Sequence, residues 1–131
     1  MKPQWWQAIL LVGAGGFVGA VARSLLAAWV ENFNASKFPL GIFFVNALGC
    51  LLIGLAFGIL DSKELHAEWR LVLITGFLGS LTTFSTFGND TLLLMQQGRM
   101  ALALTNIGLS VVVGLLAVWA GYAIAGAIRS S

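Results

Sequence analysis

The sequence contains very few charged residues. Only 9% of its 131 residues are Asp, Glu, Lys or Arg, whereas 59% are hydrophobic. A soluble domain usually carries about 25% charged residues. With so few, a fold in water could not cover its apolar core with a polar surface. The composition therefore excludes an ordinary soluble domain.

Residues that carry enzyme chemistry are also scarce. The chain has one cysteine, Cys50, and one histidine, His66. A single cysteine cannot form an internal disulfide, so we interpret Cys50 as a small packing residue and His66 as a solvated loop residue. The sequence shows no embedded acidic cluster, metal-ligand set or nucleophile with a neighbouring base. This argues against an enzyme, and we expect no nucleic-acid partner.

What the sequence has instead is a series of long apolar stretches. Each exceeds the roughly 20 residues with which a helix crosses about 30 Å of hydrocarbon. Because every backbone polar group must be paired inside lipid, we predict transmembrane helices. The four predicted spans are 5–30, 38–60, 71–96 and 100–128. The expected fold is an all-α membrane protein, a single four-helix transmembrane domain over residues 1–131, embedded in a lipid bilayer.

The basic residues outside the spans show a weak bias toward one side of the membrane. With an even number of helices both termini lie on one side, and that side would carry four basic residues against two on the other. The four are Lys2, Lys63, Arg70 and Arg129, and the two are Lys37 and Arg99. A chain with so little bias could insert in both orientations, which would permit an antiparallel homodimer.

Glycines recur in the first two spans at a spacing that lets helices approach closely. GxxxG pairs occur at Gly15 and Gly19 and at Gly54 and Gly58. In lipid such pairs are typical of helix–helix contacts, and this is our interpretation. A nucleotide-binding loop in "GAGGFVGA" is excluded, because the last glycine of the G-x-G-x-x-G pattern would have to replace Val18.

Several polar residues interrupt the apolar spans, and each allows two interpretations. Arg23 either extends toward the membrane surface or has a role in drawing anions or in tying helices together. Asn46, with Gly49 one turn later, either makes an interhelical hydrogen bond or lines a pore. In the fourth span Asn106 and Ser110 lie on one stripe, which either holds helices together or lines a narrow polar path.

The third span contains the most polar segment, "GFLGSLTTFSTFGND" at residues 76–90. Gly79 weakens a helix there by about 1 kcal/mol relative to alanine. Thr82 or Thr83 is a candidate N-cap for a second half-helix. A break would expose carbonyls suited to a cation and N–H groups suited to an anion. We therefore predict an ion site; the alternative is an unbroken helix whose hydroxyls bond their own i−4 carbonyls.

An aromatic pair follows this segment. Phe84 and Phe87 are three residues apart and share one face of a helix. Phenyl edges turned into a pore would meet an anion, whereas phenyl faces would meet a cation. A third interpretation is that the two rings only pack, and the sequence does not decide between these arrangements.

These residues also carry a resemblance to a known family. "TGFLGSLTTFSTFGND" resembles the signature of the Fluc (CrcB) fluoride channels, whose third helix carries a GGLTTFSTF motif. "GAVAR" at 19–23 and "PLGIFFVNALGC" at 39–50 are similar to the first and second helices of that family, so the resemblance covers nearly the whole chain. There are two departures. Ser80 replaces the second glycine of the motif, and Asp90 stands where the family commonly has a longer glutamate.

The resemblance implies a multi-pass protein of the bacterial inner membrane that exports fluoride passively. It implies an antiparallel, dual-topology homodimer with the third helix broken mid-membrane and two parallel fluoride pathways. The pathway residues it implies are Arg23, Asn46, Phe84, Ser85, Thr86, Phe87, Asn106 and Ser110. It further implies a central structural Na⁺ held by the backbone carbonyls of Gly79 and Thr82 from both subunits.

Two other functions are compatible with four helices in a chain of this length. One is a small dual-topology drug or ion exporter, a class that depends on a glutamate inside its first helix. The first span here has no acidic residue before Glu31, which argues against such an exporter. The other is a structural membrane subunit with no pore. Fluoride efflux in liposomes would separate all three functions.

Overall fold

The structure, a computed structural model, describes residues 3–60 and 66–130. Its elements are the helices α1 (Trp5–Asn32), α2 (Leu40–Leu60), α3 (Ala67–Trp69), η1 (Arg70–Leu78), α4 (Gly79–Leu81), α5 (Phe84–Gln96) and α6 (Met100–Ser130). Among the described residues, four helical stretches are long and apolar enough to cross a membrane. They are Trp5–Asn32, Leu40–Leu60, Ala67–Gln96 and Met100–Ser130. The prediction of four membrane-spanning helices is confirmed.

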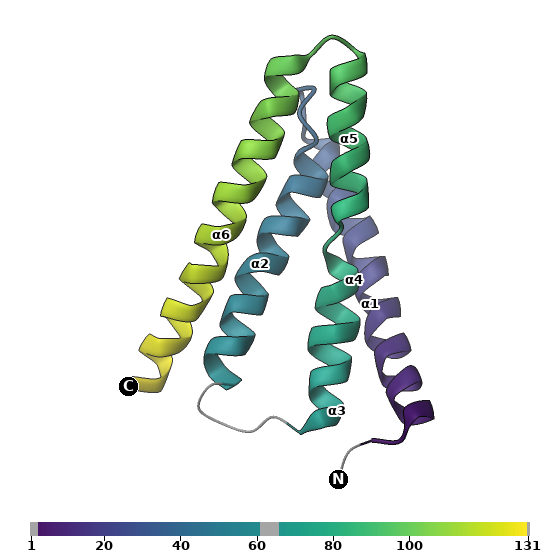
Figure 1. The fold of residues 1–131 in the computed structure, drawn as a ribbon, viewed down its shortest axis with the longest axis vertical. Helices are drawn as coiled ribbons and strands as arrows, with labels where there is room; N and C mark the ends of the chain where they lie inside the picture. The colour runs from purple at the N-terminus through teal and green to yellow at the C-terminus, as the bar shows by residue number, and fades with distance from the viewer. Residues whose placement is uncertain (1–2, 61–65, 131) are drawn as a thin grey trace.

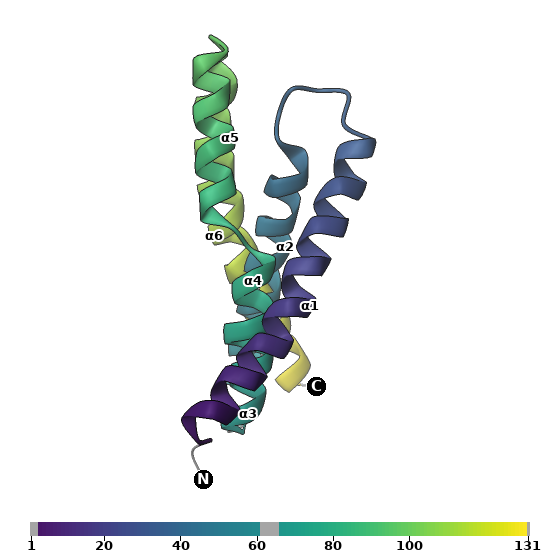
Figure 2. The ribbon, with the colours of Figure 1, turned by 90° about the vertical axis from the view of Figure 1, so that its right-hand side faces the viewer.

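The helices pack in two principal pairs. α1 packs mainly on η1, and α2 packs mainly on α6. The two termini lie at the same end of the bundle (Figure 1). Toward the opposite end, α5 and the first part of α6 diverge from the loop between α1 and α2 (Figure 2). We call this end the splayed end, although in the view of Figure 1 the helices spread instead toward the end that carries the termini.

Glycines bring α1 against the backbone of η1. A Cβ built on Gly19 would overlap the carbonyl oxygen of Phe77, and one built on Gly76 would lie 2.7 Å from the carbonyl oxygen of Val12. Gly15 and Gly19 are both buried. A larger residue at either position would hold the two helices apart. The interpretation of this GxxxG pair as a packing device is confirmed.

The second GxxxG pair brings α2 against α6 in the same way. A Cβ on Gly54 would overlap the carbonyl oxygen of Val118, and one on Gly58 would lie 2.6 Å from the Cβ of Ala125. On the opposing helix, a Cβ on Gly121 would overlap the carbonyl oxygen of Leu51. Glycines on both helices therefore make this contact, and it too confirms the packing interpretation.

The third span is not one regular α-helix. η1 is a nine-residue π-helix, a form that is rare and usually confined to single turns. α4 ends at Leu81, and the next two residues have extended backbone angles, with φ −87° and ψ 155° at Thr82 and φ −149° and ψ 118° at Thr83. α5 begins at Phe84 with Thr83 as its N-cap, as predicted for one of these two threonines.

Both connections at the splayed end have well-defined hydrogen bonds. Glu31 at the end of α1 accepts from the backbone N–H of Gly41 at 2.9 Å and from Asn34 Nδ2 at 2.6 Å, so an anion caps the start of α2. Between α5 and α6, Gly98 has φ 73°, and the N–H of Arg99 donates to the Leu94 carbonyl at 2.9 Å. This Schellman-type cap reverses the chain and places α5 antiparallel to α6.

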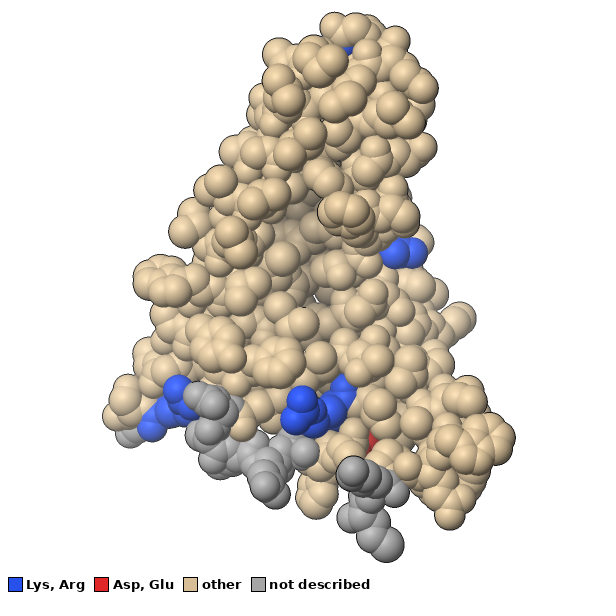
Figure 3. Space-filling view, viewed as in Figure 1, with Lys and Arg blue, Asp and Glu red and all other residues tan. Residues whose placement is uncertain are grey.

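The outer surface is apolar along most of its length. In the view of Figure 3, Lys and Arg gather chiefly at the end that carries the termini, and uncharged residues cover nearly all the rest. Large hydrophobic side chains such as Phe17, Leu115 and Trp119 are exposed. In lipid such a surface is favourable, as expected for a membrane protein. Lys2 and Lys63, which enter the predicted charge bias, lie outside the described residues.

Candidate ion site at the third span

A cavity of about 450 Å³ lies beside Thr82 and Thr83. The residues predicted for the site that line it are Asn46, Gly79, Thr82, Phe84, Phe87 and Ser110. They come from α2, from the two parts of the third span and from α6. The fold thus gathers polar and aromatic residues of three spans at the point where the third span leaves the helical conformation.

The side chain of Asn46 pairs with the backbone of Thr83. The backbone N–H of Thr83 donates to Asn46 Oδ1 at 2.8 Å, and Asn46 Nδ2 donates to the Thr83 carbonyl oxygen at 3.1 Å. One amide therefore satisfies both backbone groups of a residue that has lost its helical partners. The interhelical hydrogen bond predicted as one role of Asn46 is confirmed, and its role in lining a pore stays a prediction.

Gly49 makes room for Thr82 on the same face of α2. A Cβ built on Gly49 would overlap the Cγ2 methyl of Thr82. Gly49 is buried, as expected for a residue against which another segment is packed. Because Asn46 holds Thr83 and Gly49 admits Thr82, one face of α2 fixes both extended residues. The sequence indicates the shared face of Asn46 and Gly49 but not this contact.

Two backbone carbonyls at the site lack the donors that a continuous helix would supply. In such a helix the N–H groups of Thr83 and Thr86 would bond the carbonyls of Gly79 and Thr82. Here the Thr83 N–H donates to Asn46 Oδ1 at 2.8 Å, and the Thr86 N–H donates to Thr83 Oγ1 at 3.2 Å. The carbonyls of Gly79 and Thr82 are thereby released from the helical pattern.

The hydroxyl of Thr83 organises the first turn of α5. It accepts from the Thr86 N–H and donates to Thr86 Oγ1 at 3.1 Å. It also lies 3.2 Å from Ser85 Oγ. Ser85 and Thr86, which the resemblance assigns to the fluoride pathway, thus lie at the N-terminus of α5, where backbone N–H groups favour an anion.

Both residues of the aromatic pair line the cavity. The ring centroids of Phe84 and Phe87 are 5.5 Å apart, with an angle of 43° between the ring planes. Phe84 is 84% exposed, although it follows directly after the buried Thr83. So large an exposed ring at the middle of a membrane span must meet lipid, another protein surface or a water-filled path.

Asn106 lies behind the cavity wall. It is 1% exposed and donates through Nδ2 to Thr91 Oγ1 at 2.9 Å, while Ser110 Oγ donates to Asn106 Oδ1 at 3.4 Å. Ser110 lines the cavity, whereas Asn106, itself a described residue, is not among the residues that line it. The structure shows that the stripe makes a contact between helices, from Asn106 to Thr91, and its role in lining a polar path stays a prediction.

Thr91 is a polar residue of this region that the sequence reasoning missed. It is buried, and its hydroxyl donates to the carbonyl oxygen of Phe87 at 2.7 Å. The spacing of Thr91 and Asn106 from the turn between α5 and α6 could have indicated their contact. Thr91 lies five residues before the last residue of α5, and Asn106 lies six residues after the first residue of α6. Across a short antiparallel helix hairpin, positions at similar distances from the turn face each other.

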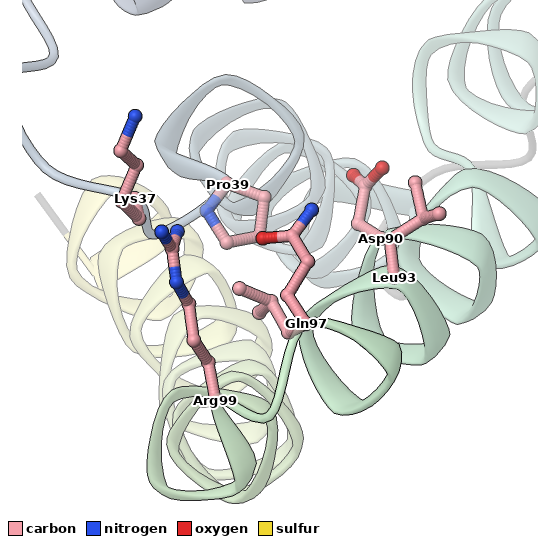
Figure 4. A pocket seen from close by; sticks show the side chains of 7 residues that line it. Lys37, Pro39, Asp90, Leu93, Gln97 and Arg99 are labelled. Atoms are coloured by element: carbon pink, nitrogen blue, oxygen red, sulfur yellow. The ribbon is translucent and has the colours of Figure 1, made fainter.

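Neither Arg23 nor Asp90, both described residues, lines the cavity. Arg23 is half-buried in α1, and it is not among the described residues that line the cavity. Asp90 lines a separate cleft of about 470 Å³ at the splayed end of the bundle. Figure 4 shows Lys37 and Arg99 on one side of this cleft, Asp90 on the other and Gln97 between them. Charges of both signs therefore share this cleft.

The sequence matches a protein-family model over most of its length. The family is described as CrcB-like protein, Camphor Resistance (CrcB), and the match covers residues 10–122. The chain belongs to the CrcB family. Its matched stretch runs from α1 into α6 and contains all the candidate site residues named above.

Curated relatives of this CrcB chain carry a common name. A protein of Acidobacterium capsulatum named fluoride-specific ion channel FluC is 45% identical over 86% of this chain and 90% of its own length. One of Symbiobacterium thermophilum, fluoride-specific ion channel FluC 2, is 48% identical over 84% of this chain and 90% of its own. A protein of Pseudomonas putida, also named fluoride-specific ion channel FluC, is 48% identical over 86% of this chain and 92% of its own length. These relatives are named as ion channels and not as enzymes.

Proposed function

We propose that this protein is a fluoride-selective channel through which fluoride leaves the cell passively across the bacterial inner membrane. The observation that carries the proposal is the cavity in which Asn46, Ser110 and the Phe84–Phe87 pair meet beside the extended residues of the third span. Relatives at 45% and 48% identity that are named fluoride-specific ion channels support it.

The cavity offers donors of the kind that a small, strongly hydrated anion needs in place of water. Asn46 Nδ2 carries two hydrogens, and only one is needed for its bond to Thr83. Ser110 adds a hydroxyl, and the edges of Phe84 and Phe87 carry partial positive charge. None of these groups has a full positive charge that would trap the ion, and conduction requires binding weak enough for release.

We further propose that the channel is an antiparallel, dual-topology homodimer with two pores. Irregular backbone at membrane depth is tolerated where protein or a water-filled path covers it. Gly79 and Phe84, on either side of the extended residues, are exposed in one protomer. A second copy related by a twofold axis would cover both, and the weak charge bias of the loops would allow its opposite orientation.

The dimer has two independent tests. Reporter fusions at the C-terminus should detect both orientations in cells, and a single orientation would refute dual topology. The second test is Gly79→Leu. Within one protomer a Cβ at Gly79 would meet nothing closer than the Ile74 carbonyl oxygen, at 3.7 Å. Because Gly79 also lines the cavity, the readout is assembly and not flux: a folded but monomeric variant would indicate a facing partner, whereas an intact dimer would argue against one.

For the proposed central Na⁺, the donors would be the carbonyls of Gly79 and Thr82 from both subunits. They fit a hard cation, because their helical donors are bonded elsewhere and because carbonyls at an interrupted membrane helix are typical Na⁺ ligands. The bound ion would supply a fixed positive charge between opposed carbonyl dipoles. This chain's own role would be to hold those carbonyls in place through Asn46 and Gly49.

Fluoride efflux tests the proposed function. Purified protein is reconstituted in liposomes loaded with potassium fluoride, and release is followed with a fluoride electrode after valinomycin makes the membrane permeable to potassium. We expect rapid release of fluoride and little release of chloride from matched liposomes. No fluoride release from liposomes that contain folded protein would refute the proposal and favour a subunit with no pore.

A further inference from the structure

The hydrogen bonds behind the cavity form a continuous chain between two of its walls. The chain runs from Ser110 to Asn106, from Asn106 to Thr91 and from Thr91 to the carbonyl of Phe87, with donor–acceptor distances of 3.4, 2.9 and 2.7 Å. Ser110 and Phe87 both line the cavity, from α6 and α5. Asn106 and Thr91 are buried at 1% and 6% exposure. Two buried polar residues thus connect two residues of the candidate pathway.

The direction of every bond in this chain is determined by chemistry. The Phe87 carbonyl can only accept, so Thr91 must use its single hydroxyl proton there. Thr91 Oγ1 is then an acceptor, and the Asn106 atom that faces it must be the NH₂ group. Asn106 Oδ1 therefore faces Ser110, which must donate its own hydroxyl proton to that oxygen.

The direction of the bond from Ser110 to Asn106 determines whether the Ser110 hydroxyl can donate to an anion in the cavity. A hydroxyl that donates to Asn106 does not present its proton to the cavity. At 3.4 Å, however, the bond from Ser110 is much longer than the usual O–H···O distance, so it is weak. Rotation of the Ser110 hydroxyl would exchange this weak bond for a strong one to an anion, since hydrogen bonds to charged acceptors are the stronger kind.

We propose that Asn106 and Thr91 are positioning residues that orient Ser110 and Phe87 toward the ion. Asn106 Oδ1 would accept the hydrogen bond of the Ser110 hydroxyl while no anion is bound. It would accept this bond again after the anion has left. Thr91 fixes the orientation of that amide and ties it to the backbone of Phe87. The inference rests on the proposed fluoride channel and gives Asn106 an indirect role in place of direct contact with fluoride.

The first test is a set of threonine substitutions measured by fluoride efflux from liposomes. Thr91→Val removes the hydroxyl and leaves the Asn106 amide without its acceptor, so flux should fall at least about tenfold. Thr91→Ser keeps the hydroxyl and should retain the flux. The matched control is Thr105→Val, because exposed Thr105 makes the same kind of bond, to the Ala101 carbonyl at 2.8 Å, without holding an asparagine.

The second test is a double-substitution cycle with Ser110→Ala and Asn106→Leu. If Asn106 acts through Ser110, the loss of flux from Asn106→Leu should be much smaller once Ser110 is already alanine. A purely structural role would instead give independent losses that multiply. Gel filtration of each variant identifies any that fail to fold.

The outcomes separate this inference from the proposed function. An absence of flux in the unsubstituted protein would refute the channel itself. If that protein conducts, the positioning role is overturned by multiplicative losses in the cycle or by full flux in Thr91→Val. If Thr91→Val does not fold, Thr91→Ser decides: retained flux supports the inference, and a tenfold loss would show that packing of the methyl group matters instead.

Discussion

Asn46 and Asn106 lie in two polar regions of one bundle and have different structural roles. Asn46 bonds the backbone N–H and carbonyl of Thr83, so its amide replaces the helical bonds that this segment has given up. Among the described residues, the side chain of Asn106 bonds those of Thr91 in α5 and Ser110 in its own helix α6. The first region maintains an unusual backbone and the second maintains the orientation of side chains. An asparagine in a membrane span can therefore support either, and only its partners show which.

The largest effect should come from Asn46→Leu. The substitution leaves two backbone groups of Thr83 without partners, and each such buried group costs about 1–3 kcal/mol. We expect fluoride flux to fall at least about 100-fold and the thermal unfolding temperature to drop. Asn106→Leu should cost less in both measurements, because no backbone group is left unpaired. Equal effects of the two substitutions would remove the distinction between the regions.

Substitution of the aromatic pair should have the next largest effect. Phe84→Ile and Phe87→Ile keep apolar bulk but remove the positive ring edges, so flux should fall at least about tenfold. Phe84 is 84% exposed, so its replacement should change the stability of a protomer little. Folded variants, dimeric by gel filtration, with undiminished flux would show that the rings only pack.

A smaller effect should follow from Gly49→Ala. The added Cβ would overlap the Cγ2 methyl of Thr82, so the extended segment must shift, and we expect a loss of flux of several-fold. Gly126→Ala is the matched control, since a Cβ there meets nothing within 4 Å. Efflux that is equal in the two variants would show that the position of Thr82 does not matter to conduction.

Much of the fold could be predicted from the sequence, because it depends on local patterns. The spans follow from runs of apolar residues, and the close helix contacts follow from GxxxG pairs such as Gly15 and Gly19. An N-cap at Thr82 or Thr83 follows from hydroxyls at a weakened point of a helix, and the structure has it at Thr83. The π-helical form of η1 could not be predicted, since no residue pattern distinguishes it from an α-helix of the same composition.

The site was less predictable, because its contacts join distant parts of the chain. Asn46 was expected to need a partner, but nothing near it in the sequence indicates Thr83. The distinction between Asn106, which is buried, and Ser110, which lines the cavity, depends on how α6 is rotated against α5. The resemblance to a family identifies residues of interest, whereas their partners come from the packing of the helices.

One measurement tests the central claim most directly: fluoride flux in liposomes with sodium on one side only. If sodium is a structural ion held by the carbonyls of Gly79 and Thr82, it does not move with fluoride. Flux should then follow the fluoride gradient and the membrane potential, and it should be indifferent to the direction of the sodium gradient. Uphill movement of fluoride driven by that gradient would contradict this account and make the protein a transporter.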